Sequence, residues 1–288
     1  MPGKSGSRST KFQAHTQRRV QSGNSQAEIR HASTAPRQNT DKLDAPGGVR
    51  LNKAIAAAGL CSRRKADELI LAGQVLVNGV LEANPARHVL PDDCIAVNGR
   101  ELTAAQEYCY LLLHKPVQTV CTVSDPEGRP TVMEYLPAGV RHLRLYPVGR
   151  LDYHSEGLLI MTNDGDLDYI LTHPSHEVTK TYEVTVRGRY SPKLADKMSR
   201  GVRIDTGITA PCEIEVLGYD KEKNKTKVKM VLHEGKNREI RKMMAAYHYP
   251  VFGLVRTGYA FLTPEGLSRG MSRRLTSEEV RKLYELYR

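Results

Sequence analysis

The stretch from Gly149 to Leu167, GRLDYHSEGLLIMTNDGDL, combines side chains that could carry out chemistry. Asp152 follows an Arg-Leu pair, and the apolar run Gly157 to Met161 begins shortly after it and predicts a buried strand. A carboxylate just ahead of a buried strand has three possible roles. It can be a structural cap, a ligand of a metal ion, or a nucleophile in catalysis.

The metal interpretation depends on the polar side chains that follow the apolar run, namely Asn163, Asp164, Asp166 and Asp168. This segment lacks the twelve-residue calcium-loop pattern with its late glutamate. Acids in the first turn of a helix also interact favourably with the helix dipole. We therefore predict that these side chains form a turn and a helix start, and we expect no metal site.

Catalysis by paired carboxylates requires a second acid close to Asp152. Glu156 is available, but the spacing of the two residues does not by itself bring their carboxylates together. The remaining catalytic hypothesis is a single carboxylate that works with other groups.

The composition limits the class of protein that must position these groups. The chain has 288 residues, which suggests about two domains, and a formal net charge of +11, which favours a polyanionic partner such as nucleic acid. No apolar run approaches the roughly 20 residues that span a bilayer. The five cysteines contain no C-x-x-C pair and the ten histidines no H-E-x-x-H spacing. Without a secretory signal, these features predict a cytoplasmic protein.

Residues 1–48 differ from the rest of the chain. They are rich in Ser, Gln, Thr, Arg and Gly and contain almost no large apolar residues, so they cannot bury enough surface to offset their ordering entropy. We predict a disordered basic tail that contacts RNA phosphates loosely. An organelle transit peptide is a less favoured alternative, because the tail shows no amphipathic helical period.

Ordered structure is predicted to begin at Val49. Two helices are expected over residues 51–58 and 63–72, the second with Ser62 as its N-cap, and each is followed by a glycine. Short apolar runs on either side of Asn78-Gly79 and Asn98-Gly99 predict two hairpins.

Arg63, Arg64 and Lys65 lie in the first turn of the second helix, where each cation opposes the dipole by about 0.3–1 kcal/mol. Their two interpretations are a solvated helix start and a phosphate-binding site. We favour the phosphate site. The segment RLNKAIAAAGLCSRRKADELILAGQVLVNG, which also contains Lys53, resembles the S4 RNA-binding domain. The resemblance implies a small α/β domain over residues 49–106 that binds RNA through Lys53 and the three helix-start cations.

Residues 107–288 show a mixed pattern of strands and helices. Strands are expected at 108–116, 157–163, 180–188, 210–220, 225–235 and 251–263, and helices at 164–173, 191–202, 237–248 and 276–287. Many antiparallel-type strands with interspersed helices predict an α+β domain built on a mixed, mainly antiparallel sheet.

Three motifs in this segment resemble the RsuA/RluB family of ribosomal pseudouridine synthases. They are GRLDYHSEGLLIMTNDG, KTYEV and EGKNREIRKM, in the family's order and preceded by an S4-like domain, as in that family. Ser155 stands where threonine is more usual. The resemblance implies that Asp152 is the catalytic aspartate and that no cofactor or metal is required. It also implies that Tyr182 stacks on the target base, that Arg241 pairs with the aspartate, and that Ile240 lines the pocket.

Four further residues have less specific roles. Arg150 either fills the gap left by a flipped base or forms a surface salt bridge. Lys236, Asn237 and Arg238 lie at the start of a predicted helix and form a second candidate phosphate site.

The resemblance implies an RNA pseudouridine synthase that acts as a monomer on ribosomal RNA or an assembling ribosomal particle, with no membrane partner. The segment GLSRGMSRRLTSEEV is more similar to the branch that modifies large-subunit RNA, and the small-subunit RNA is the alternative substrate. The competing hypothesis is a non-catalytic RNA-binding or ribosome-assembly factor, which would not need Asp152, Tyr182 and Arg241 together.

Overall fold

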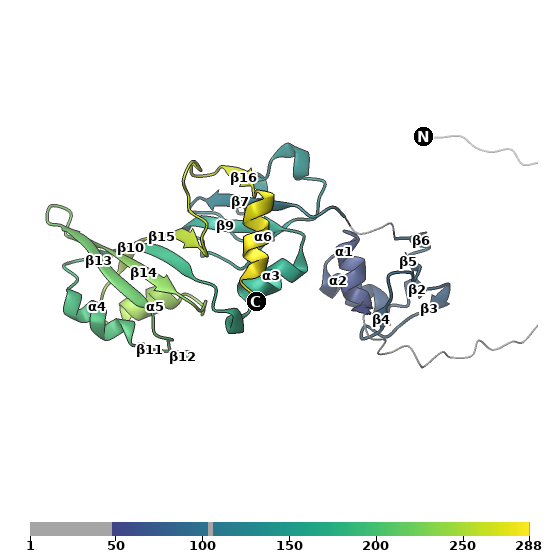
Figure 1. The fold of residues 1–288 in the computed structure, drawn as a ribbon, viewed down its shortest axis with the longest axis horizontal. Coiled ribbons are helices and arrows are strands. Elements are labelled where there is room, and N and C mark those ends of the chain that lie inside the picture. Colours follow the sequence, from purple (N-terminus) through teal and green to yellow (C-terminus); the bar gives the residue numbers. More distant parts are fainter. Residues whose placement is uncertain (1–47, 103–105, 288) are drawn as a thin grey trace, which may run out of the picture. The chain divides into compact units, whose positions relative to one another are not determined.

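The computed structural model describes residues 48–102 and 106–287 (Figure 1). The tail predicted over residues 1–48 lies outside these ranges, apart from Gly48. Among the described helices, none has both the length and the apolar character needed to cross a bilayer.

The N-terminal described segment contains two helices and short strands around one small core. Its elements are β1 (Val49–Arg50), α1 (Leu51–Ala57), α2 (Arg63–Leu71), β2 (Val75–Val77), β3 (Val80–Leu81), β4 (His88–Val89), β5 (Ile95–Val97) and β6 (Arg100–Glu101). Ser62 caps α2 by accepting a hydrogen bond from the Lys65 amide at 3.1 Å. Asn78 and Asn98 both have positive φ angles in the predicted hairpin turns. The structure thus confirms the helices, the cap and the hairpins.

The second described segment contains the remaining helices and strands. Its strands are β7 (Tyr110–Lys115), β8 (Tyr146–Pro147), β9 (Glu156–Thr162), β10 (Lys180–Arg187), β11 (Arg203–Ile204), β12 (Gly207–Ile208), β13 (Glu213–Asp220), β14 (Lys225–Leu232), β15 (Val251–Tyr259) and β16 (Ser272–Arg274). Its α-helices are α3 (Gly165–Thr172), α4 (Pro192–Ser199), α5 (Glu239–Ala245) and α6 (Ser277–Glu285), and its short 3-10 helices are η2 (Val132–Tyr135), η3 (Ala138–Val140) and η4 (Pro174–His176).

One sheet runs through this segment in the order β13-β14-β10-β15-β9-β7-β16, and β8 pairs with β9 beside this path. The neighbours β9 and β15 are parallel, and every other pair in this sheet is antiparallel. The sheet is therefore mixed and mainly antiparallel, and the fold class is α+β, as predicted.

The two central strands β7 and β9 are buried on both faces, which explains why their sequences are continuous apolar runs rather than alternating ones. Leu112 and Leu158 pack with α3 and α6 on one face. Leu111 and Leu159 pack with η2 and η3 on the other.

A separate core lies beneath β10, β14 and β15. Alternate residues of these strands point to one face, where α4 and α5 cover them (Figure 1). Because α5 is held against this face by the buried residues Ile240, Met243 and Met244, its neighbouring residue Arg241 is directed toward the strand ends.

The acidic turn after β9 has the structural role that was predicted for it. Asp164 is buried, and its Oδ1 accepts hydrogen bonds from the Asp166 and Leu167 amides at 3.0 and 3.2 Å, so it is the N-cap of α3. Its Oδ2 accepts from the hydroxyls of Tyr110 and Tyr284. These bonds join β7 and α6 to the start of α3.

Candidate active site

Asp152 lies in the loop between β8 and β9, and backbone contacts hold this loop on several sides. The Leu151 amide donates to Cys121 Sγ at 3.3 Å, and the Gln118 amide donates to the Tyr153 carbonyl at 2.7 Å. The Ser155 amide closes a turn on the Asp152 carbonyl at 3.0 Å. The carboxylate itself remains partly exposed, at 34% of its side-chain surface. The loop therefore presents one fixed, accessible carboxylate.

Lys115, at the end of β7, is hydrogen-bonded to the backbone of the same loop. It is fully buried, and its Nζ donates to the carbonyls of Ser155 at 2.7 Å and Pro116 at 2.8 Å. Burial lowers the pKa of its ammonium to about 8. The sequence analysis did not identify this residue. The available signal was a lysine at the end of the buried run YLLLHK, where a charge must find partners.

Gly157 allows β9 to approach β15 directly after this loop. Its φ is +114°, and a Cβ placed there would lie 2.3 Å from the Arg256 carbonyl oxygen. Only glycine fits both the backbone conformation and the contact. The parallel pairing of β9 with β15 therefore brings Asp152 close to the strands that carry the rest of the site.

Arg241 of α5 reaches across to the loop. Its Nε lies 3.5 Å from Asp152 Oδ2, and its Nη2 donates to the His154 carbonyl at 3.0 Å and to Ser155 Oγ at 3.3 Å. Its Nη1 donates to the Val251 carbonyl at 3.4 Å. One guanidinium thus connects α5, the start of β15 and the Asp152 loop, and places a positive charge beside the carboxylate.

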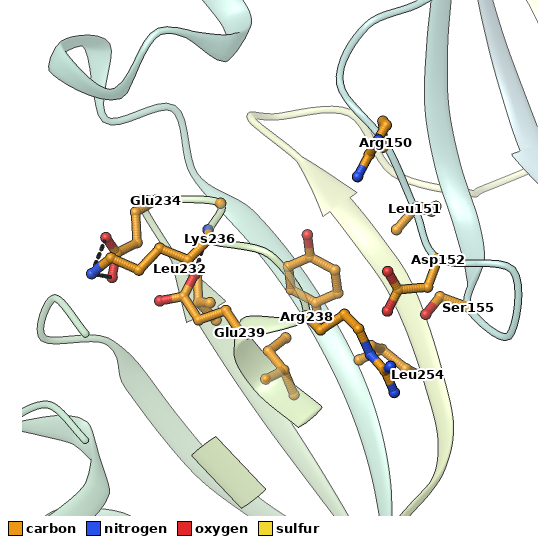
Figure 2. Close-up of a pocket in the computed structure, with 13 residues that line it drawn as sticks. Arg150, Leu151, Asp152, Ser155, Leu232, Glu234, Lys236, Arg238, Glu239 and Leu254 are labelled. Atoms are coloured by element: carbon orange, nitrogen blue, oxygen red, sulfur yellow. Dashed lines mark hydrogen bonds and ion pairs between the residues drawn. The ribbon is translucent and has the colours of Figure 1, made fainter. Parts of the chain in front are cut away.

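Asp152 opens onto a pocket with an empty space of about 480 Å³, open solvent included. The pocket is lined by Arg150, Leu151, Asp152, Ser155, Tyr182, Leu232, Glu234, Gly235, Lys236, Arg238, Glu239, Ile240 and Leu254. Figure 2 shows Asp152 and Ser155 on one side of the pocket and Glu234, Lys236 and Glu239 on the other. The aromatic ring, the carboxylate and the apolar side chains suit a planar heterocyclic base.

The three residues of the second candidate phosphate site, Lys236, Asn237 and Arg238, do not all lie at the pocket. Lys236 and Arg238 line the pocket, whereas Asn237 does not. The Lys236 Nζ is bound to Glu234 Oε2 at 2.8 Å and to the Ile208 carbonyl at 2.9 Å. Arg238 is the N-cap of α5 and has a positive φ of 52°. Arg150 is exposed at the pocket rim (Figure 2). Glu156 pairs with Arg269 at 2.9 Å and does not line the pocket.

A pair of glutamates forms the pocket wall opposite Asp152, and the sequence analysis did not identify it. Glu239 is buried, is hydrogen-bonded to the Glu234 carboxylate, and accepts from the Lys236 amide at 3.0 Å. Glu234 accepts from the Ala210 amide at 2.6 Å. Burial, and then the Glu234 carboxylate, raise the pKa of Glu239 to about 8, while contacts with Glu239 and Lys236 lower the pKa of Glu234. The pair therefore retains one proton at neutral pH.

Replacing Glu239 with glutamine tests this shared proton. The folded chain keeps a proton that the unfolded chain loses above its ordinary pKa of 4.5, so wild-type stability falls as pH rises from there to about 8. Glutamine keeps the hydrogen bonds and is neutral throughout. Between pH 6.5 and 9 we expect the Tm of the wild type to fall at least about 3 °C further than that of Glu239→Gln, which corresponds to about 1 kcal/mol.

Thermal denaturation followed by circular dichroism measures this difference. The buried cation Lys115 titrates in both proteins and cancels in the comparison, whereas the pKa of Lys180, lowered to about 8 mainly by burial, also responds to the charge of Glu239. Glu183→Gln, at a partly exposed glutamate that pairs with Lys227, is the matched control and should follow the wild type. Parallel curves for wild type and Glu239→Gln would show that the glutamates do not share a proton.

The site has no protein donors arranged for a metal ion. Within residues 48–102 and 106–287, no group of three His, Cys, Asp or Glu side chains converges on one point.

Comparison with known proteins defines the class to which this fold and site belong. The sequence model of the RNA pseudouridylate synthase family matches residues 109–246, and that of the S4 domain matches residues 49–95. The chain belongs to the RNA pseudouridine synthase family, and it is an enzyme of that class with an S4 domain ahead of its catalytic domain. The predicted domain limits, 49–106 and 107–288, remain predictions.

Individual relatives make the match more specific. The chain is 41% identical over 237 residues to ribosomal large subunit pseudouridine synthase B of Bacillus subtilis, which covers 82% of this chain and 96% of the relative. It is 39% identical over 241 residues to an uncharacterized RNA pseudouridine synthase of Mycobacterium leprae, covering 83% and 93%. A crystal structure of a pseudouridylate synthase superposes with a TM-score of 0.59 at 28% identity, covering 82% of this chain and 99% of that one.

Proposed function

We propose that this enzyme isomerises a uridine of ribosomal RNA, in the large subunit, to pseudouridine, with Asp152 as the catalytic carboxylate. The observation that carries the proposal is the ion pair between Asp152 and Arg241 at the edge of a pocket lined by Tyr182. The similarity to a relative named as a large-subunit enzyme supports the choice of substrate.

The reaction requires one bond to break and one to form at the same ribose carbon. The bond from C1′ to N1 of the uracil is broken, the base turns, and a bond from C1′ to C5 is made. C5 then loses its proton, and N1 ends with one, so the product is an isomer and no oxidant or reductant is needed. In this reaction Asp152 acts as an anion that attacks the nucleoside or assists detachment of its base, and the Arg241 guanidinium lies beside it.

The other pocket residues hold the base during this turn. Tyr182 supplies an aromatic face for a base that has left its stack, a contact worth roughly 1–3 kcal/mol. Ile240 and Leu254 supply an apolar wall. Arg150, exposed at the rim, is suited to enter the gap that a flipped base leaves in the RNA.

The RNA around the target uridine is bound by charged and polar side chains of the S4 domain and of the pocket edge. We propose that Lys53, Arg63, Arg64 and Lys65 of the S4 domain contact phosphates, together with Lys236, Asn237 and Arg238 near the pocket. The substrate is then ribosomal RNA, free or in an assembling particle, in the cytoplasm. The positive charge of the chain supports this assignment.

Neutralising the helix-start cations tests the S4 part of the proposal. Arg63, Arg64 and Lys65 are exposed, and Lys65 also pairs with Glu68 at 2.7 Å. Changing all three to glutamine should reduce the slope of log affinity against log salt by about two to three, at roughly 0.7–0.9 per phosphate contact. The Tm should hold or rise slightly, because the cations oppose the helix dipole. Binding titrations of ribosomal RNA at several salt concentrations measure the slope.

The control changes Lys221 and Lys223, exposed cations of the turn between β13 and β14, to glutamine. If the slope of the helix-start variant equals that of the wild type, the cluster is a solvated helix start and not a phosphate site.

The proposed reaction itself is tested by mapping pseudouridines. Unmodified large-subunit and small-subunit ribosomal RNA are incubated separately with the purified protein, and pseudouridines are located by carbodiimide labelling and primer extension. We expect one new pseudouridine in the large-subunit RNA. Tight binding with no new pseudouridine in either RNA would instead support a non-catalytic assembly factor.

A further inference from the structure

A cluster of aromatic and imidazole rings lies outside the pocket, where α3 and η4 meet the C-terminal end of α6. It consists of Tyr169, His173, His176 and Tyr287, which we call the ring cluster. Tyr169 lies 4.8 Å from His173 and 5.2 Å from His176, measured between ring centroids. Tyr287 packs edge-on against His176 at 4.9 Å. The four rings thus form one connected group contributed by three segments.

His173 is exposed, and His176 is partly buried. Tyr169 is 52% exposed and Tyr287 is 61% exposed. His176 also lines a neighbouring hollow, together with Val178, Phe261 and Leu286 among others. Phe261 is itself 42% exposed, and the Lys282 ammonium lies 6.0 Å from its ring centroid. Several large ring faces on one side of a domain are costly to expose unless they bind a partner.

We propose that the ring cluster and the adjoining hollow form a second RNA-contact surface, on which unpaired bases next to the target uridine stack. This inference rests on the proposed function, because it requires an RNA substrate in the pocket. Single-stranded bases are recognised mainly by stacking on Phe, Tyr and His rings, and a nearby cation strengthens the contact. The cluster supplies Tyr and His rings with polar tips that tolerate water, and the hollow supplies Phe261 with the Lys282 ammonium beside it.

The ring cluster is also connected to the pocket by short structural links. Glu177, which lines the hollow, follows His176, and its carbonyl contacts His233 Nδ1 at 3.2 Å. His233 directly precedes Glu234 of the pocket wall. On the other side, Thr179 of the hollow lies three residues before Tyr182 in the sequence, which spans about 10 Å of extended chain. An RNA strand that leaves the pocket can therefore reach the hollow within a few nucleotides.

The nature of the surface favours RNA over a protein partner. Protein-binding patches are also enriched in aromatic residues, but their fully buried centres are mainly apolar. Here the central residues are two imidazoles, with His173 Nδ1 at 2.7 Å from Ser175 Oγ and His176 Nδ1 at 2.9 Å from the Ile170 carbonyl. These bonds hold both rings in place, which suits a stacking surface. At this surface the Lys282 ammonium beside Phe261 suits a polyanion, as does the positive net charge of the chain as a whole.

The test removes ring faces while keeping apolar bulk, in the double variant Tyr169→Leu, His173→Leu of the full chain. The first probe is a stem-loop of ribosomal RNA that carries the mapped target uridine and has 2-aminopurine at an adjacent unpaired position. The second, abasic probe is the same RNA with abasic sugars at the unpaired positions. For the wild type we expect quenching of 2-aminopurine fluorescence on binding. The variant should lose most of this quenching and bind the probe about tenfold more weakly, while the abasic probe binds equally to both proteins.

Phe252→Leu is the matched control, because Phe252 is 57% exposed on β15, packs with Lys225, and does not belong to the cluster. It should bind both probes as the wild type does. An unchanged affinity in the double variant, or an equal loss on the abasic probe, would overturn the proposal. A change in self-association seen by sedimentation, with RNA affinity unchanged, would likewise overturn it in favour of a protein contact. Pseudouridine formation by the wild type is assayed in the same preparations, so that failure of the proposed function is recognised separately.

Discussion

Replacement of Asp152 by asparagine is expected to lower pseudouridine formation by at least about 1,000-fold, which corresponds to a loss of about 4 kcal/mol in transition-state stabilisation. Asparagine is nearly the same size and still accepts a hydrogen bond, but it has no charge and cannot act as the carboxylate. RNA affinity should stay within about tenfold, or 1.4 kcal/mol, because most contacts with the RNA are made elsewhere.

The fold should also survive this change. Arg241 loses its ionic partner but keeps its bonds to His154, Ser155 and Val251, so the guanidinium is not left unsatisfied. The assay is the pseudouridine content of ribosomal RNA after single-turnover incubation with an excess of purified protein. Tyr182→Phe should be much milder than Asp152→Asn, since the stacking face remains.

Asp196→Asn is the matched control, because Asp196 is an exposed acid of α4 that pairs with Arg200 at 2.8 Å. It should be fully active. If Asp152→Asn converts uridine at a rate near that of the wild type, Asp152 has only the structural role that its sequence position also permits, and the proposed mechanism is wrong.

Replacement of Arg241 by glutamine should reduce kcat/KM by about 100-fold, the second largest effect that we expect. The guanidinium places a positive charge beside Asp152 and also holds the backbone of the Asp152 loop. Loss of a positioned charge in an active site commonly costs a factor of about 100 to 1,000. Arg241→Lys keeps the charge but not the planar fork, so it should retain about ten times more activity than the glutamine variant.

The same assay, together with thermal denaturation, separates the two functions of Arg241. Loss of its hydrogen bonds should cost about 1–3 kcal/mol of folding free energy in both variants, whereas only the glutamine variant loses the charge. Arg200→Gln, at the exposed arginine that follows α4 as its C-cap, is the control and should change neither quantity. Equal activities of Arg241→Gln and wild type would show that the ion pair has no part in catalysis.

Much of the local structure could be predicted from the sequence, because it depends on neighbouring residues. The Asn-Gly hairpins follow from the positive φ angles that these residues accept, and both asparagines have them in the structure. Ser62, Ser191 and Asp164 cap helices through bonds to amides two or three residues further on. The apolar runs of β7 and β9 predicted buried strands. The last helix was expected over residues 276–287, and in the structure Thr276 is the N-cap of α6.

The roles proposed for Asp152, Tyr182 and Arg241 come from the family resemblance, not from periodicity or spacing. The residues around Asp152 are by themselves compatible with a cap, a metal ligand and a nucleophile. The helix-start role of the acids that follow β9 could be predicted from the sequence, because an N-cap and a helix dipole act over a single turn.

The composition of the site was decided by the tertiary structure. No periodic pattern marks Lys115, Cys121 or Glu234, and each of them contacts a distant segment. Glu239 acts through its hydrogen bond with Glu234. The parallel pairing of β9 with β15 brings Asp152 near β10 and α5, and it depends on the close approach at Gly157. Local propensity identifies helices, strands and turns. The order of the strands in the sheet decides which distant side chains come into contact. The buried charges among them must then find partners.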